Sequence, residues 1–234
     1  MVNLKALGVF ILFGFSFQAQ EFSGVVFEDT NENGIHDKGE KGLENMLVTN
    51  GKEVVKSAAD GSFQLPNIEL AHFITVHQPA NYSVKEFFIK TSENRKSYDF
   101  AFVSKPKKET VSFVQISDTE TYEFRDWLND LKEYVQTEKP DFTIHTGDIC
   151  YKKGLLFHSQ EVNSEKLGGR MLYCIGNHDL VEGEYGEEMY EELLGPVYYS
   201  SKKEIHYLSL PLWLTEIISH IILKSKCIIG WLIY

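Results

Sequence analysis

Three short polar segments carry most of the side chains that could do chemistry, and each follows an apolar run. They are residues 116–120 (ISDTE), 146–148 (TGD) and 176–179 (GNHD). Asp118 and Asp148 are hard oxygen donors, which repel each other at short range unless a cation lies between them. Asn177 adds an amide oxygen, and His178 can donate a proton or act as a further ligand. Two metal ions roughly 3.5–4 Å apart can clamp a phosphate and supply a nucleophile near neutral pH.

The elements that must position these side chains are short strands separated by a helix. Apolar runs precede the three segments, at residues 111–116, 142–144 and 171–175. Between the first two runs, apolar residues recur at spacings of three and four, which is typical of an amphipathic helix. Strands alternating with helices indicate a parallel sheet, whose strand carboxyl ends open onto one crevice. We therefore expect Asp118, Asp148 and Asn177 to converge there.

Each segment taken alone has a simpler explanation. A GD dipeptide is commonly a turn, and a DTE sequence commonly caps a helix, so Thr119 and Glu120 could open the helix that follows. The ordered trio, each member placed after an apolar strand, favours the functional interpretation.

The order of the three segments resembles the calcineurin-like metallophosphoesterase superfamily, and GNHD at a strand end is the most specific part. The resemblance implies that Asp118 binds the first metal, Asp148 bridges both metals and Asn177 binds the second. It implies that His178 protonates the leaving oxygen or steadies the phosphate. Asp179 resembles the support residue that orients His178.

Glu120 stands where the family usually has a histidine ligand, and a carboxylate favours harder ions than imidazole does. The cofactors implied are two divalent or trivalent transition-metal ions, Mn, Fe or Zn. The substrate implied is a phosphate mono- or diester, on a small molecule or a polymer. The fold implied is an incomplete α/β metallophosphoesterase-like layered sandwich over residues 111–210.

Residues 21–104 lack helical periodicity, and short strands with polar turns indicate a small all-β sandwich before the α/β part. Residues 29–40 fit the twelve-position calcium-loop pattern. The expected calcium ligands are Asp29, Asn31, Asn33, Ile35, Asp37 and Glu40. The segment resembles calcium-binding, collagen-adhesin-like repeats of bacterial surface proteins and the accessory amino-terminal domain of some bacterial calcineurin-like phosphoesterases. The alternative is an acidic turn without an ion.

Residues 1–20 read as a secretory signal peptide, with Lys5 before an apolar core at residues 7–17. The alternative is a membrane anchor, but the run is short for a stable membrane span. We therefore expect export, to the periplasm, the cell surface or the exterior of a bacterium. Cys150 and Cys174 could pair in an oxidising compartment, although two small buried apolar residues are the preferred interpretation.

The chain has 234 residues and a net charge of −11, which argues against specific nucleic-acid binding because that needs a basic face. No pattern addresses the oligomeric state. Residues 105–110 are a polar, charged stretch that we interpret as a linker.

Residues 211–234 fit neither an amphipathic helix nor an alternating strand, and the family's later GHxH motif is absent from the sequence. We therefore hypothesise an aberrant tail produced by truncation or by a frameshift near residues 210–216, and the alternative is a divergent natural carboxyl terminus. A site without these histidines should be weak or inactive. The alternative function is a calcium-dependent surface or adhesion-type binding module that carries a non-catalytic phosphoesterase remnant.

Overall fold

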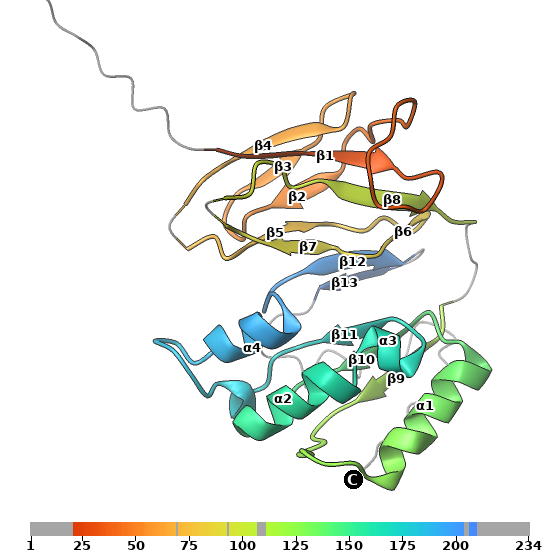
Figure 1. Ribbon diagram of the computed structural model, residues 1–234, viewed down its shortest axis with the longest axis vertical. Helices are drawn as coiled ribbons and strands as arrows, with labels where there is room; N and C mark the ends of the chain where they lie inside the picture. The colour runs from red at the N-terminus through yellow and green to blue at the C-terminus, as the bar shows by residue number, and fades with distance from the viewer. Residues whose placement is uncertain (1–20, 69, 93, 107–110, 204–205, 210–234) are drawn as a thin grey trace, which may run out of the picture.

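The computed structural model describes residues 21–68, 70–92, 94–106, 111–203 and 206–209. The predicted signal peptide, the aberrant tail and most of the predicted linker lie outside these residues. The chain forms an all-β part and an α/β part stacked on each other, with the hairpin β12–β13 between them (Figure 1).

The all-β part consists of two four-stranded sheets. In the first, the order is β4-β1-β8-β6, and β1 pairs antiparallel with β4 but parallel with β8. In the second, the order is β3-β2-β5-β7 and all pairs are antiparallel. The strand bounds are β1 (Glu21–Glu28), β2 (Leu47–Thr49), β3 (Val54–Lys56), β4 (Ser62–Pro66), β5 (Phe73–Val76), β6 (Tyr82–Val84), β7 (Phe88–Lys90) and β8 (Phe100–Ser104).

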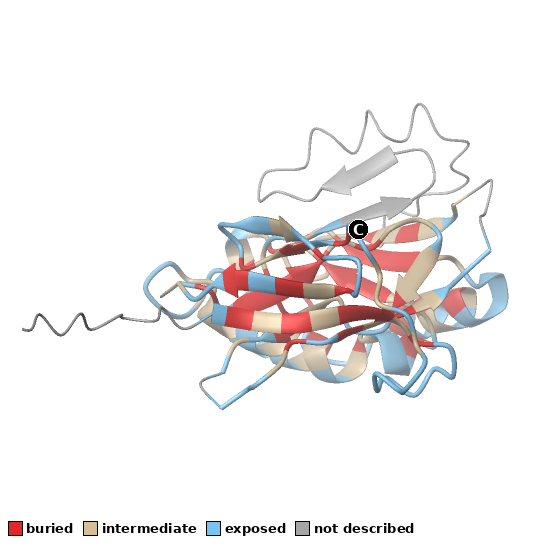
Figure 2. Ribbon diagram, turned by 90° about the horizontal axis from the view of Figure 1, so that it is seen from above, coloured by how far each residue is buried: buried red, intermediate tan, exposed pale blue. Residues whose placement is uncertain are grey.

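Alternating side chains from the two sheets form one apolar core. Phe22, Val26, Ile74, Phe100 and Phe102 are among its buried members. Figure 2 shows buried residues interleaved with exposed ones along these strands, which is the alternation expected when one face of each sheet is covered. The predicted all-β region is confirmed.

The α/β part is built on a three-stranded parallel sheet in the order β11-β10-β9. This confirms the predicted parallel sheet and its incomplete α/β character. Its elements are β9 (Phe113–Ile116), α1 (Asp126–Glu138), β10 (Phe142–His145), α2 (Tyr151–Glu161), α3 (Ser164–Leu167), β11 (Met171–Tyr173), the 3-10 turn η1 (Asn177–Asp179), α4 (Glu188–Leu194), β12 (Ser200–Lys203) and β13 (His206–Ser209).

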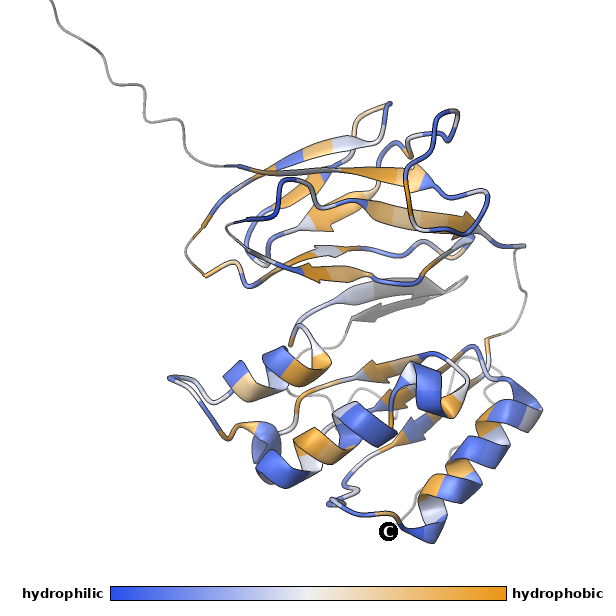
Figure 3. Cartoon of the chain, in the orientation of Figure 1, coloured by the Kyte–Doolittle hydropathy of each residue, from blue (hydrophilic) through white to orange (hydrophobic). Residues whose placement is uncertain are grey.

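The two faces of this sheet bury different partners because side chains alternate along each strand. On one face, Ile116 and Met171 pack with Leu128 and Val135 of α1 and with Leu155 of α2. Figure 3 shows apolar residues recurring along α1 between hydrophilic ones, as its predicted amphipathic pattern requires. The other face is a smaller cluster centred on Phe142, Ile144 and Leu172, which Phe87 of the all-β part and Tyr199 also contact.

Several side chains join the two parts. The rings of Phe87 and Tyr199 lie 5.0 Å apart, and His72 Nδ1 lies 2.6 Å from a carboxylate oxygen of Glu191. Arg170 Nη1 donates to Oε1 of Gln78. Within the described residues, no helix combines the length and apolar character needed to cross a bilayer.

Candidate metal centre

The three predicted segments meet at the carboxyl edge of the parallel sheet. The backbone N–H of Asp118 donates to the carbonyl of Gly147 at 3.1 Å, and the backbone N–H of His178 donates to Oδ1 of Asp148 at 3.2 Å. A Cβ on Gly147 would lie 2.7 Å from the backbone of Gly176, so the second and third loops touch where only glycine fits. We call the three loops, residues 117–121, 146–151 and 176–179, the strand-tip centre.

Backbone strain is concentrated in the strand-tip centre. Of the eight described non-glycine residues with positive φ, five lie in its first two loops: Asp118, Glu120, Asp148, Cys150 and Tyr151. Left-handed backbone conformations cost free energy for residues with a side chain, and such residues gather at sites where the surroundings enforce them. The loops are therefore held in shape by contacts beneath and between them.

Asp179 supplies one of these contacts. Its side chain is buried, Oδ1 accepts from the backbone N–H of Cys150 at 3.0 Å, and Oδ2 accepts from that of Gly176 at 2.9 Å. Burial raises the pKa of this carboxyl, and the backbone donors partly offset the effect. Both oxygens bind backbone rather than the imidazole of His178, so Asp179 orients the loop that carries His178 and not the ring itself.

A chain of hydrogen bonds beneath the first loop was not predicted from the sequence. Thr119 Oγ1 lies 2.9 Å from Nε2 of His145 and 3.1 Å from Nε2 of His158. Tyr173 Oη lies 3.5 Å from Nδ1 of His158 and donates to the carbonyl of Val162 at 2.5 Å. Both imidazoles are fully buried.

The direction of every bond in this chain follows from one fixed donor. The backbone N–H of Gly147 donates to Nδ1 of His145, so Nε2 of that ring carries the proton and donates to Thr119. Thr119 must then donate to Nε2 of His158, which leaves Nδ1–H of His158 to face Tyr173. Every donor and acceptor in this series of hydrogen bonds has a partner only when both imidazoles are neutral. Burial lowers the pKa of both rings, that of His158 to about 4, which favours the neutral forms.

Above this support, three side chains approach one another. Potential ligand atoms of Glu120, Cys150 and His178 all lie within 4.8 Å of one another. Cys150 Sγ is 3.4 Å from Nδ1 of His178, which in turn is 4.0 Å from a carboxylate oxygen of Glu120. The Tyr151 ring stacks on the imidazole of His178 at 5.8 Å.

Cys150 and Tyr151 are additions to the site that sequence reasoning missed; the available signal was their position two and three residues after Asp148. Burial is the main cause that raises the pKa of the Cys150 thiol to about 12, and nearby carboxylates add to it. Cys150 and Cys174 are both free, so the alternative of a disulfide between them is not realised.

The predicted calcium loop is a separate cluster, which we call the acidic loop (residues 29–40). It follows strand β1 directly, and Asp29 is buried at its base. Asp29 Oδ2 accepts from the backbone N–H of Gly34 at 2.7 Å, and Glu40 Oε1 accepts from that of Thr30 at 2.8 Å. The carboxylates at both ends of the loop are therefore turned inward.

Two amides complete the interior of the acidic loop. Nδ2 of Asn31 and Nδ2 of Asn33 each lie 2.8 Å from Oδ2 of Asp37, and these bonds lower the pKa of that carboxyl. A cation in this position would take the place of the two hydrogen bonds, with the amide oxygens turned toward it. The Ile35 side chain is exposed, which suits a residue expected to contribute only its carbonyl.

A family model described as Calcineurin-like phosphoesterase matches residues 111–228, which include all three loops of the strand-tip centre. The chain belongs to the calcineurin-like phosphoesterase family. A second model, described as N terminal of Calcineurin-like phosphoesterase, matches residues 30–115, which cover most of the all-β part. A comparison with curated proteins found no match. The match over residues 111–228 extends into residues 211–234, which we predicted to be an aberrant tail. The truncation or frameshift therefore stays a prediction.

Membership of the calcineurin-like phosphoesterase family implies divalent metal ions in the active site. The donor set fits such ions, because carboxylate, imidazole and thiol groups are all ligands of transition metals and three of them already converge. Asp118 and Asn177 are exposed at the same sheet edge, where their side chains remain accessible to an ion.

Proposed function

We propose that the strand-tip centre hydrolyses phosphate mono- or diesters with the help of two transition-metal ions, Mn, Fe or Zn. The observation that carries the proposal is the convergence of Glu120, Cys150 and His178 at the carboxyl edge of a parallel sheet, in loops that the family's motifs occupy. Bound cations would neutralise phosphate charge and supply a nucleophile near neutral pH. That local positive charge is needed because the chain carries a net charge of −11.

Each side chain has a proposed role. Asp118 and Glu120 hold the first cation, and Asp148 holds both. Asn177 supplies an amide oxygen to the second cation. His178 donates a proton to the leaving oxygen or a hydrogen bond to the phosphate, and its ring is steadied by Tyr151.

Cys150 is proposed as a further ligand, and it changes the expected metal preference. Its Sγ lies 3.4 Å from Nδ1 of His178, and a thiolate with imidazole favours zinc over magnesium or calcium. With the family's later histidines absent from the sequence, we propose that turnover in this chain is slow or absent.

The experiment is hydrolysis of p-nitrophenyl phosphate and of bis-p-nitrophenyl phosphate by the metal-free full chain, with Mn²⁺, Fe²⁺ or Zn²⁺ added in turn. We expect slow, metal-dependent release of p-nitrophenol. Asp148→Asn should reduce it by about a thousandfold, or about 4 kcal/mol of transition-state stabilisation, because the carboxylate proposed to hold both cations is lost. The matched control is Asp130→Asn, on the exposed surface of α1.

The two outcomes separate the function classes. Hydrolysis that is equal in Asp148→Asn and Asp130→Asn would exclude this centre as the source of activity. Metal binding without hydrolysis, lost in Asp148→Asn, would identify a folded but silent phosphoesterase.

We also propose that the acidic loop binds calcium through Asp29, Asn31, Asn33, Ile35, Asp37 and Glu40. The inward carboxylates and the buried position of Asp29 support this. A calcium-dependent surface or adhesion module is the second candidate function, and it would show calcium-dependent stabilisation without any hydrolysis. Export to the periplasm, the cell surface or the exterior is proposed from residues 1–20.

A further inference from the structure

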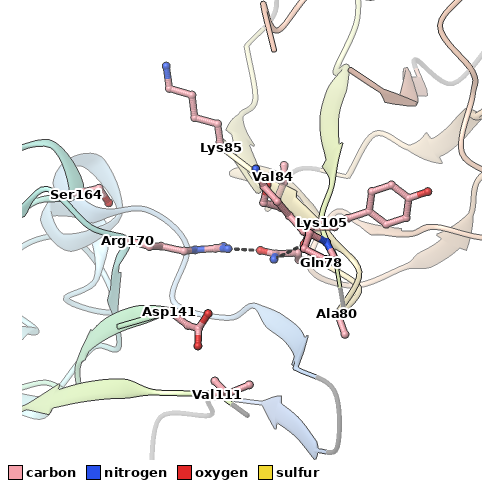
Figure 4. A pocket seen from close by; sticks show the side chains of 12 residues that line it. Gln78, Ala80, Val84, Lys85, Lys105, Val111, Asp141, Ser164 and Arg170 are labelled. Atoms are coloured by element: carbon pink, nitrogen blue, oxygen red, sulfur yellow. Dashed lines mark hydrogen bonds between the residues drawn. The ribbon is translucent and has the colours of Figure 1, made fainter. Parts of the chain in front are cut away.

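A cavity of about 530 Å³ lies where the all-β part meets the α/β part (Figure 4). On the α/β side its walls include Arg170, Asp141 and Val111, which directly or closely precede β11, β10 and β9. These residues mark the amino edge of the parallel sheet. The strand-tip centre is at the carboxyl edge of the same strands, so the cavity and the catalytic loops are separated by the length of the sheet.

The most informative side chain in this cavity is Arg170. Its Nη1 donates to Oε1 of Gln78, which is 1% exposed, and its guanidinium lies 5.5 Å from the centre of the Phe87 ring. Both partners are neutral, so neither compensates the charge. Desolvation is the main cause that lowers the pKa of Arg170, which is the direction expected when a cation is held away from water.

The rest of the lining adds positive charge. Lys85 and Lys105 line the cavity from the all-β side and are exposed, while Asp141 is the acidic side chain of the lining. Three cations and one carboxylate give a formal lining charge of +2, in a chain whose net charge is −11. Such a local reversal of sign concentrates small anions.

The remaining walls are largely apolar. Ala80, Val84, Pro106 and Val111 line the cavity together with Tyr82. A ligand that fills this space would therefore need an uncharged body as well as an anionic group. Its volume is in the range of small-molecule sites, which combine apolar walls with a few fixed polar groups.

We propose that this interdomain cavity is a second ligand site, distinct from the metal centre, for a small organic anion that carries a phosphate or carboxylate group on an apolar body. Arg170 and Lys105 bind the anionic group, Lys85 adds positive potential at the rim although its side chain is directed away from Arg170 (Figure 4), and the apolar walls take the body. Because the ligand contacts both parts of the chain at once, its binding stabilises their docking.

The experiment uses the full chain with the Asp148→Asn substitution in EDTA, so that the metal centre cannot contribute. Isothermal titration calorimetry compares phenylphosphonate, inorganic phosphate and benzyl alcohol as probes. We expect phenylphosphonate to bind more tightly than inorganic phosphate and benzyl alcohol to bind least. The double variant K85E/K105E should weaken phenylphosphonate binding by at least about tenfold, from the lost contact to Lys105, and further through the reversed charge at Lys85.

The matched control is K52E/K56E, which changes the net charge equally at exposed positions of the all-β part that do not line the cavity. An equal loss of binding in both double variants would overturn the proposal, as would unchanged binding in K85E/K105E. Absence of phenylphosphonate binding in the Asp148→Asn chain would also overturn it. These outcomes are independent of whether the chain hydrolyses phosphate esters, because the metal centre is disabled throughout.

Discussion

The acidic loop and the strand-tip centre both bring carboxylates close together, but they do so with different parts of the chain. In the acidic loop every group comes from twelve consecutive positions, and backbone N–H groups of the loop itself satisfy Asp29 and Glu40. In the strand-tip centre the groups come from three loops separated by a helix or more, and a buried chain through Thr119 supports the first loop.

This difference predicts which substitutions would disrupt the structure of each site. The acidic loop depends on local turn geometry and follows strand β1 of the all-β part. The strand-tip centre depends on buried polar groups, which are costly to leave without a partner. Substitutions that never touch a ligand should therefore damage the strand-tip centre and spare the acidic loop.

Removal of the Thr119 hydroxyl should have the largest effect. Thr119→Val leaves Nε2–H of His145 and the Nε2 lone pair of His158 without partners in the protein interior. We expect the free energy of unfolding to fall by roughly 2–6 kcal/mol, from two unsatisfied buried groups at about 1–3 kcal/mol each. Urea unfolding measures the change, and Thr119→Ser, which keeps the hydroxyl, is the control. A Thr119→Val protein as stable as the parent would contradict the claim that the Thr119 hydroxyl is the partner on which both buried imidazoles depend.

The second largest effect should be a loss of stability of the α/β part at low pH. The pKa of His158 is about 4 in the folded chain against about 6.5 when unfolded, so protonation favours the unfolded state, and stability is lost as the pH falls from about 6.5 to about 4. The difference between these two pKa values corresponds to a loss of unfolding free energy on the order of 3 kcal/mol. His145 acts in the same direction.

The acidic loop should keep its stability at a lower pH than the strand-tip centre does. The lowered pKa of Asp37 contributes stability that is present above its ordinary value of 3.8 and lost only below it. Hydrogen exchange between pH 7 and pH 4 should therefore show residues 113–179 opening before residues 21–104. Simultaneous opening of both regions would refute the contrast.

Calcium should stabilise the all-β part selectively. At a calcium concentration of one hundred times the dissociation constant, the gain in unfolding free energy is about 2.7 kcal/mol. We expect the gain in thermal scans of the parent chain and of Glu44→Gln, an exposed position outside the loop, but not of Glu40→Gln. If the parent melts at the same temperature with calcium or with EDTA, the loop is an acidic turn.

The smallest effect concerns the thiol of Cys150. Cobalt(II) bound at the strand-tip centre should show a sulfur-to-metal charge-transfer band, because Cys150 Sγ lies within 4.8 Å of the other two ligand atoms. Cys150→Ser should remove the band and weaken cobalt binding by about tenfold, while Cys174→Ser should change neither. An unchanged spectrum in Cys150→Ser would mean that the sulfur is not a ligand.

The sequence predicted those features that depend on local pattern. The apolar runs placed β9, β10 and β11 correctly, and the three-and-four spacing predicted α1, whose Leu128, Leu131 and Val135 are buried. The parallel order followed from the alternation of strands with a helix. The acidic loop was predicted from spacing alone, because all its groups lie within twelve consecutive residues, and its calcium binding stays a prediction.

What the sequence did not predict arises from contacts between distant segments. The apolar pattern of α2 is weak because its buried face includes Gly154 and His158, so periodicity gave little signal. The hydrogen bonds of Thr119 reach His145 and His158, which lie 26 and 39 positions further along the sequence. No local motif could predict contacts between such distant residues. The interdomain cavity depends on how two separately patterned parts dock.

The position of β1 has a consequence for how the chain is made. This strand is the first described element, yet it lies in the interior of its sheet, with β8 as its parallel neighbour from residue 100 onward. The sheet therefore cannot be completed on the ribosome until about a hundred residues have emerged, and pairing so distant in sequence is intrinsically slow. Until then the edge of β1 that β8 covers has unpaired backbone groups, which exposes the nascent chain to mispairing with other strands.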